Sequence, residues 1–293
     1  ETTCYIYSQI CKFSCEDQNA IILYTTNGTY PDLNNDKEYI EPFEITNLTQ
    51  LRIVSYYPNY DYYSQTIEIV PNIFYADKDE MFVINDNGII TEYKGTISNL
   101  KVPDVINNIL VSGFESGTFS DATITGLYLP NGVKTIPSKA FYNNESIYYI
   151  QGDGVETVEQ SAFDHAINLF HAIFPNLKTV GISSFNNSSL IEANYPLLES
   201  VDYASFASTK IYEFYGENVK SINRLSFGRC QNLSTVSLPE CIEAKYAISA
   251  TSTSGSFYGC TSLCKVYMPK IEILNKGCFR SCPLDEVDLP SLK

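Results

Sequence analysis

A phenylalanine recurs through most of this 293-residue chain at nearly constant spacing. Successive intervals are 22, 22, 22, 21, 21, 30 and 22 residues, so one copy carries an insertion. A fixed period of about 20 to 50 residues is typical of solenoids, in which each repeat buries its apolar side against its neighbours. The recurring phenylalanines are Phe119, Phe141, Phe163, Phe185, Phe206, Phe227, Phe257 and Phe279.

Each phenylalanine is followed by a predicted strand. Four or five residues lead into the pattern Leu-x-x-Val-x-Leu, which Leu233, Val236 and Leu238 show in full before Pro239. Proline cannot donate to a β-ladder, so it ends the strand. One strand per repeat, stacked in parallel, predicts a continuous core that no single copy can form.

The segment before the repeats has a different pattern. Short runs of strand-forming residues alternate with turns, which favours a small β-sandwich over residues 1–72. Residues 81–103 then predict a β-hairpin at Asp86-Asn87-Gly88, followed by a first degenerate strand. We expect this hairpin to cap the solenoid. The predicted sandwich strands are 11–15, 21–26, 41–45, 50–57 and 65–70.

The residue pattern of the repeats resembles that of a known family. Ala/Ser-Phe followed by Leu-x-x-Val-x-Leu-Pro, with Gly88-Ile89-Ile90-Thr91 at the cap, resembles the BspA-like (Treponema-type) leucine-rich repeat over residues 81–293. The resemblance implies a right-handed leucine-rich-repeat solenoid with a parallel sheet. It also implies a secreted or cell-surface protein of a host-associated bacterium, with a role in adhesion and protein binding.

The first segment has a resemblance of its own. Residues 20–31 and 39–45 resemble the chitobiase/β-hexosaminidase C-terminal-type module, although Asn27 replaces the usual Asp and Glu41 the usual Gly. This resemblance implies an immunoglobulin-like accessory domain without catalytic residues. The expected chain is therefore mostly β, with an Ig-like sandwich followed by the solenoid.

Charge and hydropathy exclude several classes of partner. The formal net charge is −15, which disfavours nucleic acid because phosphate binding depends on Lys and Arg. The same charge disfavours anionic membrane surfaces and otherwise indicates little beyond solubility. We expect a monomer. No apolar run approaches the ~20 residues of a membrane helix, so we expect no membrane insertion.

The sequence offers no convincing catalytic or metal site. The two histidines, His165 and His171, are six residues apart, which matches no zinc-ligand spacing. Glu192 and Glu213 fall on adjacent repeats and could imitate the carboxylate pair of a retaining glycosidase. A flat strand face, however, supplies no pocket to raise a carboxyl pKa. We expect a non-enzymatic protein without a cofactor.

Nine cysteines leave at least one thiol without an intramolecular partner. Four occupy positions where other repeats carry small residues, which predicts buried, unreactive thiols. Spacing leaves open whether any of Cys4, Cys11 and Cys15 form a disulfide. The four cysteines in the repeats are Cys230, Cys260, Cys278 and Cys282.

The exposed strand positions form the candidate binding surface. They are rich in tyrosine and carboxylates, with Tyr148, Phe170 and Tyr212 beside them, and exposed Tyr suits interfaces. The plainer reading is that β-propensity alone placed tyrosine there. The predicted partner-binding residues are Tyr128, Tyr149, His171, Glu192, Glu213, Tyr215 and Tyr267.

Two further functions stay open at this stage. The first is carbohydrate binding, because tyrosine faces can stack on sugars, and the second is an architectural spacer in a larger secreted protein. The expected partner is a protein or glycoprotein of a host or matrix. The chain begins at Glu1, so any signal or anchor is not visible, and the sequence does not say whether the native chain continues past Lys293.

Overall fold

The structure is a computed structural model in which the chain forms two compact units, Glu1–Ile73 and Phe74–Lys293. Nearly all of the second unit is described, whereas the first unit is described in shorter segments. The described residues are 2–7, 10–15, 19–25, 31, 33, 37–40, 43–44, 51–59, 62–63, 67–69, 74–120, 124–245 and 255–293.

The first unit consists of two antiparallel sheets, as expected for a small sandwich. One sheet has the order β1-β2-β5, and the other has the order β4-β3-β6-β7 with β8 also on β6. Leu23, Ile53 and Val54 are buried on the second sheet. The strand at Thr2–Tyr7, β1, is not among the predicted strands. The strands are β1 Thr2–Tyr7, β2 Ile10–Cys15, β3 Ile21–Thr25, β4 Lys37–Glu38, β5 Phe43–Glu44, β6 Leu51–Tyr57, β7 Tyr62–Tyr63 and β8 Ile67–Ile69.

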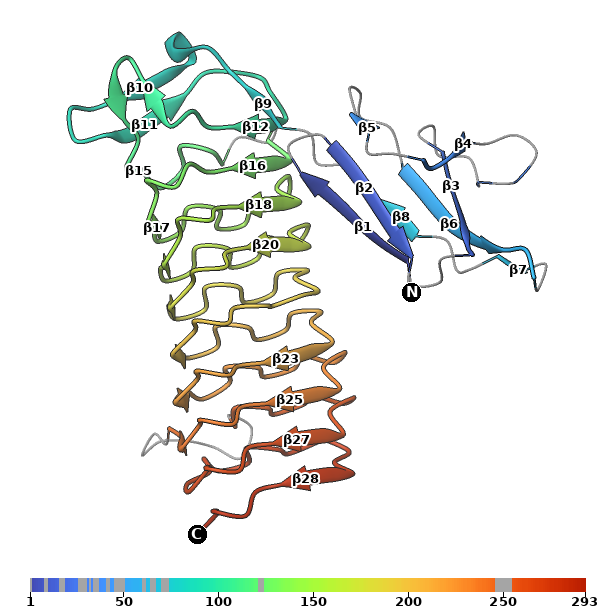
Figure 1. Cartoon of the computed structure of the whole chain (residues 1–293). Helices are drawn as coiled ribbons and strands as arrows, with labels where there is room; N and C mark the ends of the chain where they lie inside the picture. Colours follow the sequence, from blue (N-terminus) through green and yellow to red (C-terminus); the bar gives the residue numbers. More distant parts are fainter. Residues whose placement is uncertain are drawn as a thin grey trace. The chain divides into compact units, whose positions relative to one another are not determined.

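The second unit is a solenoid with almost no helix, in which successive coils stack along one axis (Figure 1). Every coil but the one around Ala193 contributes a short strand to the same side, and neighbouring strands pair in parallel and in register. The strands on this side are β9 Tyr75–Ala76, β12 Asn99–Lys101, β16 Gly126–Tyr128, β18 Tyr149–Gln151, β20 His171–Ile173, β23 Glu213–Tyr215, β25 Thr235–Ser237, β27 Lys265–Tyr267 and β28 Glu286–Asp288.

A second parallel sheet follows the first within each coil, and its buried positions are mostly Val and Ile. At the start of the solenoid, the predicted hairpin is present as β10 and β11, after a short 3-10 helix, η1, at Asp79–Met81. The second-sheet strands are β17 Thr135–Ile136, β19 Thr157–Val158, β21 Thr179–Val180, β22 Ser200–Val201, β24 Ser221–Ile222 and β26 Glu243–Ala244. The start of the solenoid contains β10 Phe82–Ile84, β11 Ile89–Tyr93, β13 Val105–Ile106, β14 Ile109–Leu110 and β15 Gly113–Phe114.

The recurring phenylalanines form a continuous stack from Phe141 to Phe279. Neighbouring ring centroids lie 5.1 to 5.5 Å apart, with interplanar angles of 2° to 14°. The stack also spans the interval of 30 residues, where the Phe227 and Phe257 rings are 5.3 Å apart. Phe119 lies outside it and packs against Phe114 instead. The predicted inserted loop at 247–255 lies outside the described residues except for Gly255.

The amide groups beside these rings connect the coils. The Phe163 N–H donates to the Ser184 carbonyl of the next coil at 2.7 Å, and the Phe185 N–H donates to the Ser205 carbonyl at 2.8 Å. Buried backbone groups must be paired, so this arrangement satisfies the amides while it brings the rings together. The Phe stack and the inter-coil hydrogen bonds therefore fix one common register.

The strand stack is interrupted at one coil. The sequence predicts a strand around Ala193, but the first-sheet ladder stops at β20 and resumes at β23. In this coil, Tyr195 occupies an interior position that is Leu129 or Phe174 elsewhere, and its hydroxyl donates to the Ala172 carbonyl at 3.1 Å. In a regular ladder, the Ala172 carbonyl would accept a hydrogen bond from a backbone amide of the next strand. The Tyr195 hydroxyl thus takes up one ladder acceptor on the β20 side of the interruption.

The cysteines of the solenoid are free thiols, as the small-residue positions predicted. The Cys230 and Cys260 thiols donate to the Phe206 and Phe227 carbonyls of the preceding coils, at 2.9 and 3.0 Å. Burial raises the pKa of the Cys278 thiol to about 12, which keeps it protonated at neutral pH. Cys282 is only partly buried. The predicted possibility of a disulfide that includes Cys4 or Cys11 stays open, because these two side chains are outside the described part of the structure.

Removing one ring from the stack is expected to destabilise the solenoid. Phe185→Ala opens a cavity between two rings, and we expect it to lower the free energy of unfolding by about 3–5 kcal/mol. Phe185→Leu retains most of the volume and is expected to cost less. Urea unfolding followed by circular dichroism measures both changes. Tyr142→Ala, on the exposed surface, is the control, with an expected change within about 0.5 kcal/mol. A loss below about 1 kcal/mol for Phe185→Ala would contradict the role of the stack.

Candidate functional site

The side of the first sheet that faces away from the Phe stack carries the predicted site; we call it the sheet face. Within the strands before β28 the middle residue is buried, as Ile150, Ala172 and Phe214 show, and the residues on either side of it lie on the outer side. In β28, the last strand, the middle residue Val287 is exposed. This alternation follows from the period of two in a strand. It places all seven predicted site residues on the sheet face, but in unequal surroundings.

Phe74 covers the first part of the sheet face. Its ring centroid lies 5.9 Å from that of Tyr128 and 5.5 Å from that of Tyr149. The strand β9 follows directly after Phe74 and pairs with β12, which holds this ring over the sheet. Tyr128 and Tyr149 are half-buried as a result. The sequence analysis did not anticipate this cover, because Phe74 stands outside the repeats.

The hydroxyl groups of these two tyrosines are also engaged. The Tyr149 hydroxyl donates to Gln151 Oε1 at 2.8 Å, and the Tyr128 hydroxyl donates to Asp153 Oδ2 at 3.4 Å. Gln151 Nε2 in turn donates to Asp153 Oδ1 at 3.0 Å. Burial and the nearby Asp153 carboxylate raise the pKa of Tyr149 to about 12. These two side chains therefore have structural partners within the solenoid.

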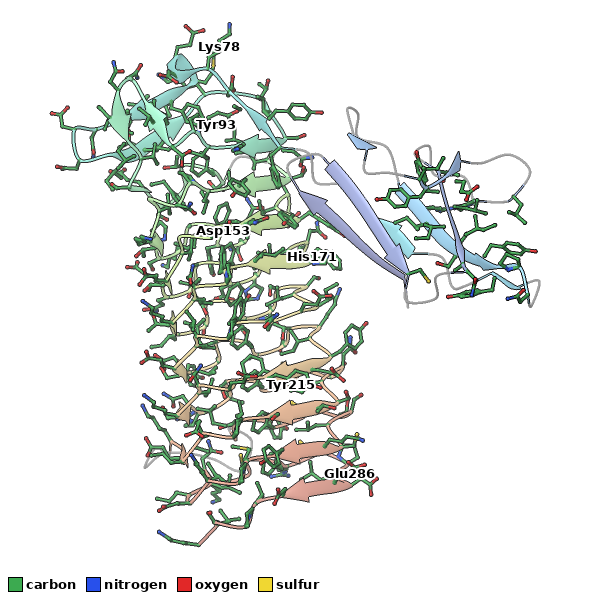
Figure 2. The ribbon with its side chains drawn as sticks, in the orientation of Figure 1. Lys78, Tyr93, Asp153, His171, Tyr215 and Glu286 are labelled. Carbon is green, nitrogen blue, oxygen red and sulfur yellow. The ribbon has the colours of Figure 1, made fainter. Side chains whose placement is uncertain are left out.

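The middle of the sheet face is open, and its exposed and half-buried residues form a group that we call the central patch. Tyr148, Ile173, Tyr212 and Tyr215 are between 42% and 56% exposed, although three of them are aromatic and one aliphatic. Figure 2 shows Tyr215 and His171 on the side of the solenoid that carries the first-sheet strands. The central patch comprises Tyr148, Phe170, His171, Ile173, Glu192, Tyr212, Glu213 and Tyr215.

Aromatic contacts organise the upper part of the central patch. The Tyr148 and Phe170 ring centroids are 5.0 Å apart, and Tyr148 also lies 5.9 Å from His171. Lys210 Nζ lies 5.3 Å from the centre of the Phe170 ring, which is a cation–π distance. Burial lowers the pKa of His171, and the Glu192 carboxylate partly opposes that change.

The two glutamates lie lower in the central patch and are exposed. Glu213 accepts a hydrogen bond from the Tyr215 hydroxyl at 3.0 Å. Glu192 lies on the interrupted coil, one repeat before Glu213. Neither glutamate forms an ion pair with the described residues. Their exposure leaves no desolvated environment of the kind that a glycosidase acid needs.

The last predicted residue, Tyr267, lies apart from the central patch. One coil, which carries Ser237 at this position, lies between Tyr215 on β23 and Tyr267 on β27. The neighbouring Lys265 pairs with Glu286 at 3.0 Å. His171, Glu192, Glu213 and Tyr215 thus lie in the open part of the sheet face, whereas Phe74 covers Tyr128 and Tyr149. The covered and open parts adjoin, because the Tyr149 and His171 ring centroids are 6.2 Å apart.

A second surface feature lies on the other sheet of the solenoid. A shallow groove of about 540 Å³ runs over β19, β21 and β22, and it contains none of the predicted site residues. Its lining is largely polar, with Thr157, Thr179, Glu159 and Asp202 around Gly181. Within the described part of the chain, no cluster of His, Cys, Asp and Glu has the geometry to hold a metal ion.

The repeat region matches the profile of a known protein family. The profile of the BspA type leucine rich repeat region matches residues 92–213, 199–255 and 215–293, which together span well over half of the chain. The chain belongs to the BspA-type leucine-rich-repeat family. The matched residues include all coils that carry the central patch, so the candidate surface lies within the family's repeat region.

The first unit matches a second profile. Residues 3–60 match the chitobiase/beta-hexosaminidase C-terminal domain, as the sequence resemblance indicated. None of the curated proteins compared with the chain is significantly similar to it. Among the residues that the structure describes, no helix has the length and apolar character needed to cross a membrane.

Several solved structures resemble the chain. A leucine rich repeat protein of T. pallidum shares 19% identity with a TM-score of 0.48, over 75% of this chain and 91% of its own. A leucine rich cell surface protein of Faecalibacterium prausnitzii shares 18% identity with a TM-score of 0.45, over 71% and 74%. A leucine-rich repeat protein of Bacteroides ovatus shares 14% identity with a TM-score of 0.33, over 72% and 78%.

The position of His171 in the central patch has a measurable consequence. Because burial lowers its pKa below the usual 6.5, its NMR titration midpoint is expected below that value. Glu192→Gln removes the carboxylate that raises this pKa, so the midpoint is expected to fall further. His171 also binds its proton more readily when unfolded. Its contribution to stability is therefore lost as the pH falls from about 6.5 toward the folded pKa.

The titration can be assigned because the chain has only two histidines. A His165→Gln variant retains His171 as its single histidine signal. Glu286→Gln, which removes a distant carboxylate, is the control and is expected to leave the His171 midpoint unchanged. A His171 midpoint above 6.5, or one that does not respond to Glu192→Gln, would contradict the arrangement of the two side chains in the central patch.

Proposed function

We propose that this protein binds a protein or glycoprotein partner through the central patch of its solenoid. The observation that carries the proposal is the set of exposed Tyr148, Ile173, Tyr212 and Tyr215 side chains, which lie in or directly before β18, β20 and β23, on either side of the interrupted coil. Solenoids commonly bind partners on such extended surfaces. Exposed aromatic residues are enriched at interfaces because they bury a large area with little loss of conformational entropy.

One part of the sheet face is covered and another part is open, so the seven predicted residues contribute unequally to the proposed contact. Phe74 occupies the surface of Tyr128 and Tyr149, so these residues contribute less to a partner contact. Tyr267 is exposed but lies outside the group. We therefore propose that His171, Glu192, Glu213 and Tyr215, with Tyr148 and Tyr212 beside them, form the main contact.

The cellular setting is part of the proposal. The F. prausnitzii protein of similar fold is described as a cell surface protein, which supports an extracellular or cell-surface location for this chain. We propose a non-enzymatic role, because the described residues hold no enclosed site with perturbed acidic groups. The net charge of −15 supports a monomer, since two copies repel each other. The domains that we propose are 1–72 and 81–293.

Removal of the two most exposed aromatic side chains in the patch is expected to weaken binding. The full chain is probed against an array of matrix proteins, mucins and glycans, and the strongest protein interaction is then measured by surface plasmon resonance. Tyr212→Ala combined with Tyr215→Ala is expected to weaken it at least tenfold, because truncating an aromatic anchor costs about 1–2 kcal/mol. The melting temperature is expected to stay nearly constant because both side chains are exposed.

Tyr142→Ala is the matched control, since Tyr142 is exposed to a similar degree in a turn off the sheet face. Equal binding by wild type and the double variant would contradict the proposal. A glycan interaction that the double variant retains would instead favour carbohydrate binding elsewhere in the chain. The absence of any interaction on the array would favour the architectural role.

A further inference from the structure

Three cysteines occupy the same repeat position on consecutive coils. Cys230, Cys260 and Cys282 each follow a stacked phenylalanine at the same spacing. Each thiol makes the same contact, because it donates to the backbone carbonyl of the phenylalanine one coil earlier, at 2.9, 3.0 and 3.1 Å respectively. We call these three side chains the thiol column.

The last two coils of the thiol column are held at hydrogen-bonding distance. The Phe257 N–H donates to the Cys278 carbonyl at 2.9 Å, and the Gly259 N–H donates to the Arg280 carbonyl at the same distance. The Phe257 and Phe279 rings stack 5.3 Å apart in the same register. A disulfide needs Cα atoms about 4.4–6.8 Å apart, a range that includes the spacing of hydrogen-bonded neighbouring backbones. The backbone geometry therefore allows a cross-link between these coils.

The thiols also contact one another, and one of them is accessible. The Cys260 thiol interacts with the thiols of Cys230 and Cys282 on either side. Cys230 and Cys260 are fully buried, whereas Cys282 is only partly buried. The hydrogen bond with Cys260 lowers the pKa of Cys282, which favours its thiolate form. Cys282 is therefore the thiol of the column that reacts first with an external reagent.

The coil that carries Cys282 is less buried than the coils before it. Phe279 is partly buried, whereas the other rings of the stack are fully buried. Val287 in β28 is 46% exposed, although Val236 and Val266 are buried at the same repeat position. Less buried apolar surface gives this coil less hydrophobic stabilisation. A covalent link to the preceding coil therefore adds most here.

We propose that Cys260 and Cys282 form a disulfide when the protein meets a small-molecule disulfide as oxidant, and that this bond fastens the coil of Phe279 to that of Phe257. The Cys282 thiolate attacks one sulfur of the oxidant, which releases one thiol and leaves a mixed disulfide on Cys282. The Cys260 thiolate then attacks the Cys282 sulfur and releases the second thiol. The two protein thiols give up two protons and two electrons, and the two released thiols carry them away.

This proposal assigns reactivity to a position where the sequence predicts unreactive thiols. A small, buried position accounts for Cys230, but the partial exposure of Cys282 does not fit an inert role. The proposed extracellular location supplies the oxidising conditions in which disulfides persist. The cross-link does not involve the central patch, so its test needs no binding partner.

The test incubates the full chain with oxidised glutathione at about pH 8, where thiolates form. Tryptic cleavage after Arg229, Lys245 and Arg280 places the three cysteines of the thiol column in separate peptides. Mass spectrometry of the digest is expected to find the Cys260 peptide linked to the Cys282 peptide. Dithiothreitol is expected to release the two peptides.

Oxidation is also expected to raise the melting temperature of the protein. The bond joins residues 22 positions apart, and such a cross-link restricts the unfolded chain. We expect a rise of at least about 4 °C by circular dichroism. Dithiothreitol is expected to reverse it.

Serine variants assign the bond to its two partners. Cys260→Ser is expected to remove both the linked peptides and the rise in melting temperature. The solenoid accommodates serine there, since Ser188 occupies the same repeat position in another coil. Cys230→Ser and Cys264→Ser are the matched controls, because each removes a nearby thiol and leaves both partners of the bond. Both controls are expected to keep the link and the rise.

Three results would overturn the inference. The first is a link from Cys282 to Cys230, Cys264 or Cys278 in place of Cys260. The second is a Cys282 that stays unmodified or stops at the mixed disulfide with glutathione. The third is a link that leaves the melting temperature unchanged, because the bond would then fasten nothing.

Discussion

The stacking of one phenylalanine on the next is the interaction on which the solenoid depends. Rings 5.1 to 5.5 Å apart run through seven coils from Phe141 to Phe279, while the adjacent amide groups donate to the following coil. A single repeat cannot bury its ring, so each coil requires its neighbours. The apolar contact and the backbone hydrogen bonds favour the same register, which makes the whole stack rigid.

This rigid interior determines what the exterior can do. Because every coil repeats the same backbone, the outward positions of the sheet face form straight columns that tolerate many residue types. The residues at these outward positions differ from coil to coil. Phe74 covers Tyr128 and Tyr149, a lysine pairs with Glu286, and the coils between hold exposed aromatics around Glu192 and Glu213. The central patch is therefore a local property of a regular scaffold.

The repeat period was enough to predict the solenoid, its parallel strands and the buried positions of Phe185 or Val236. These follow from spacing alone, since every copy obeys the same pattern. The interruption at Tyr195 was not predictable in this way, because its hydroxyl acts across coils on the Ala172 carbonyl. Nor was the cover by Phe74, which belongs to a segment without a repeat. Column patterns identify which residues face outward, but they do not reveal which of them another segment covers.

The most direct test of this account is the chemical reactivity of individual tyrosines in the free protein. Brief treatment with tetranitromethane followed by peptide mass spectrometry reports nitration at each ring, and the reagent attacks accessible phenolates. The account predicts rapid modification of the exposed Tyr148 and Tyr212, and slow modification of Tyr149 and the buried Tyr195, whose pKa values are raised by burial. Modification of Tyr149 as fast as Tyr212 would contradict the division of the sheet face into a covered part and an open central patch.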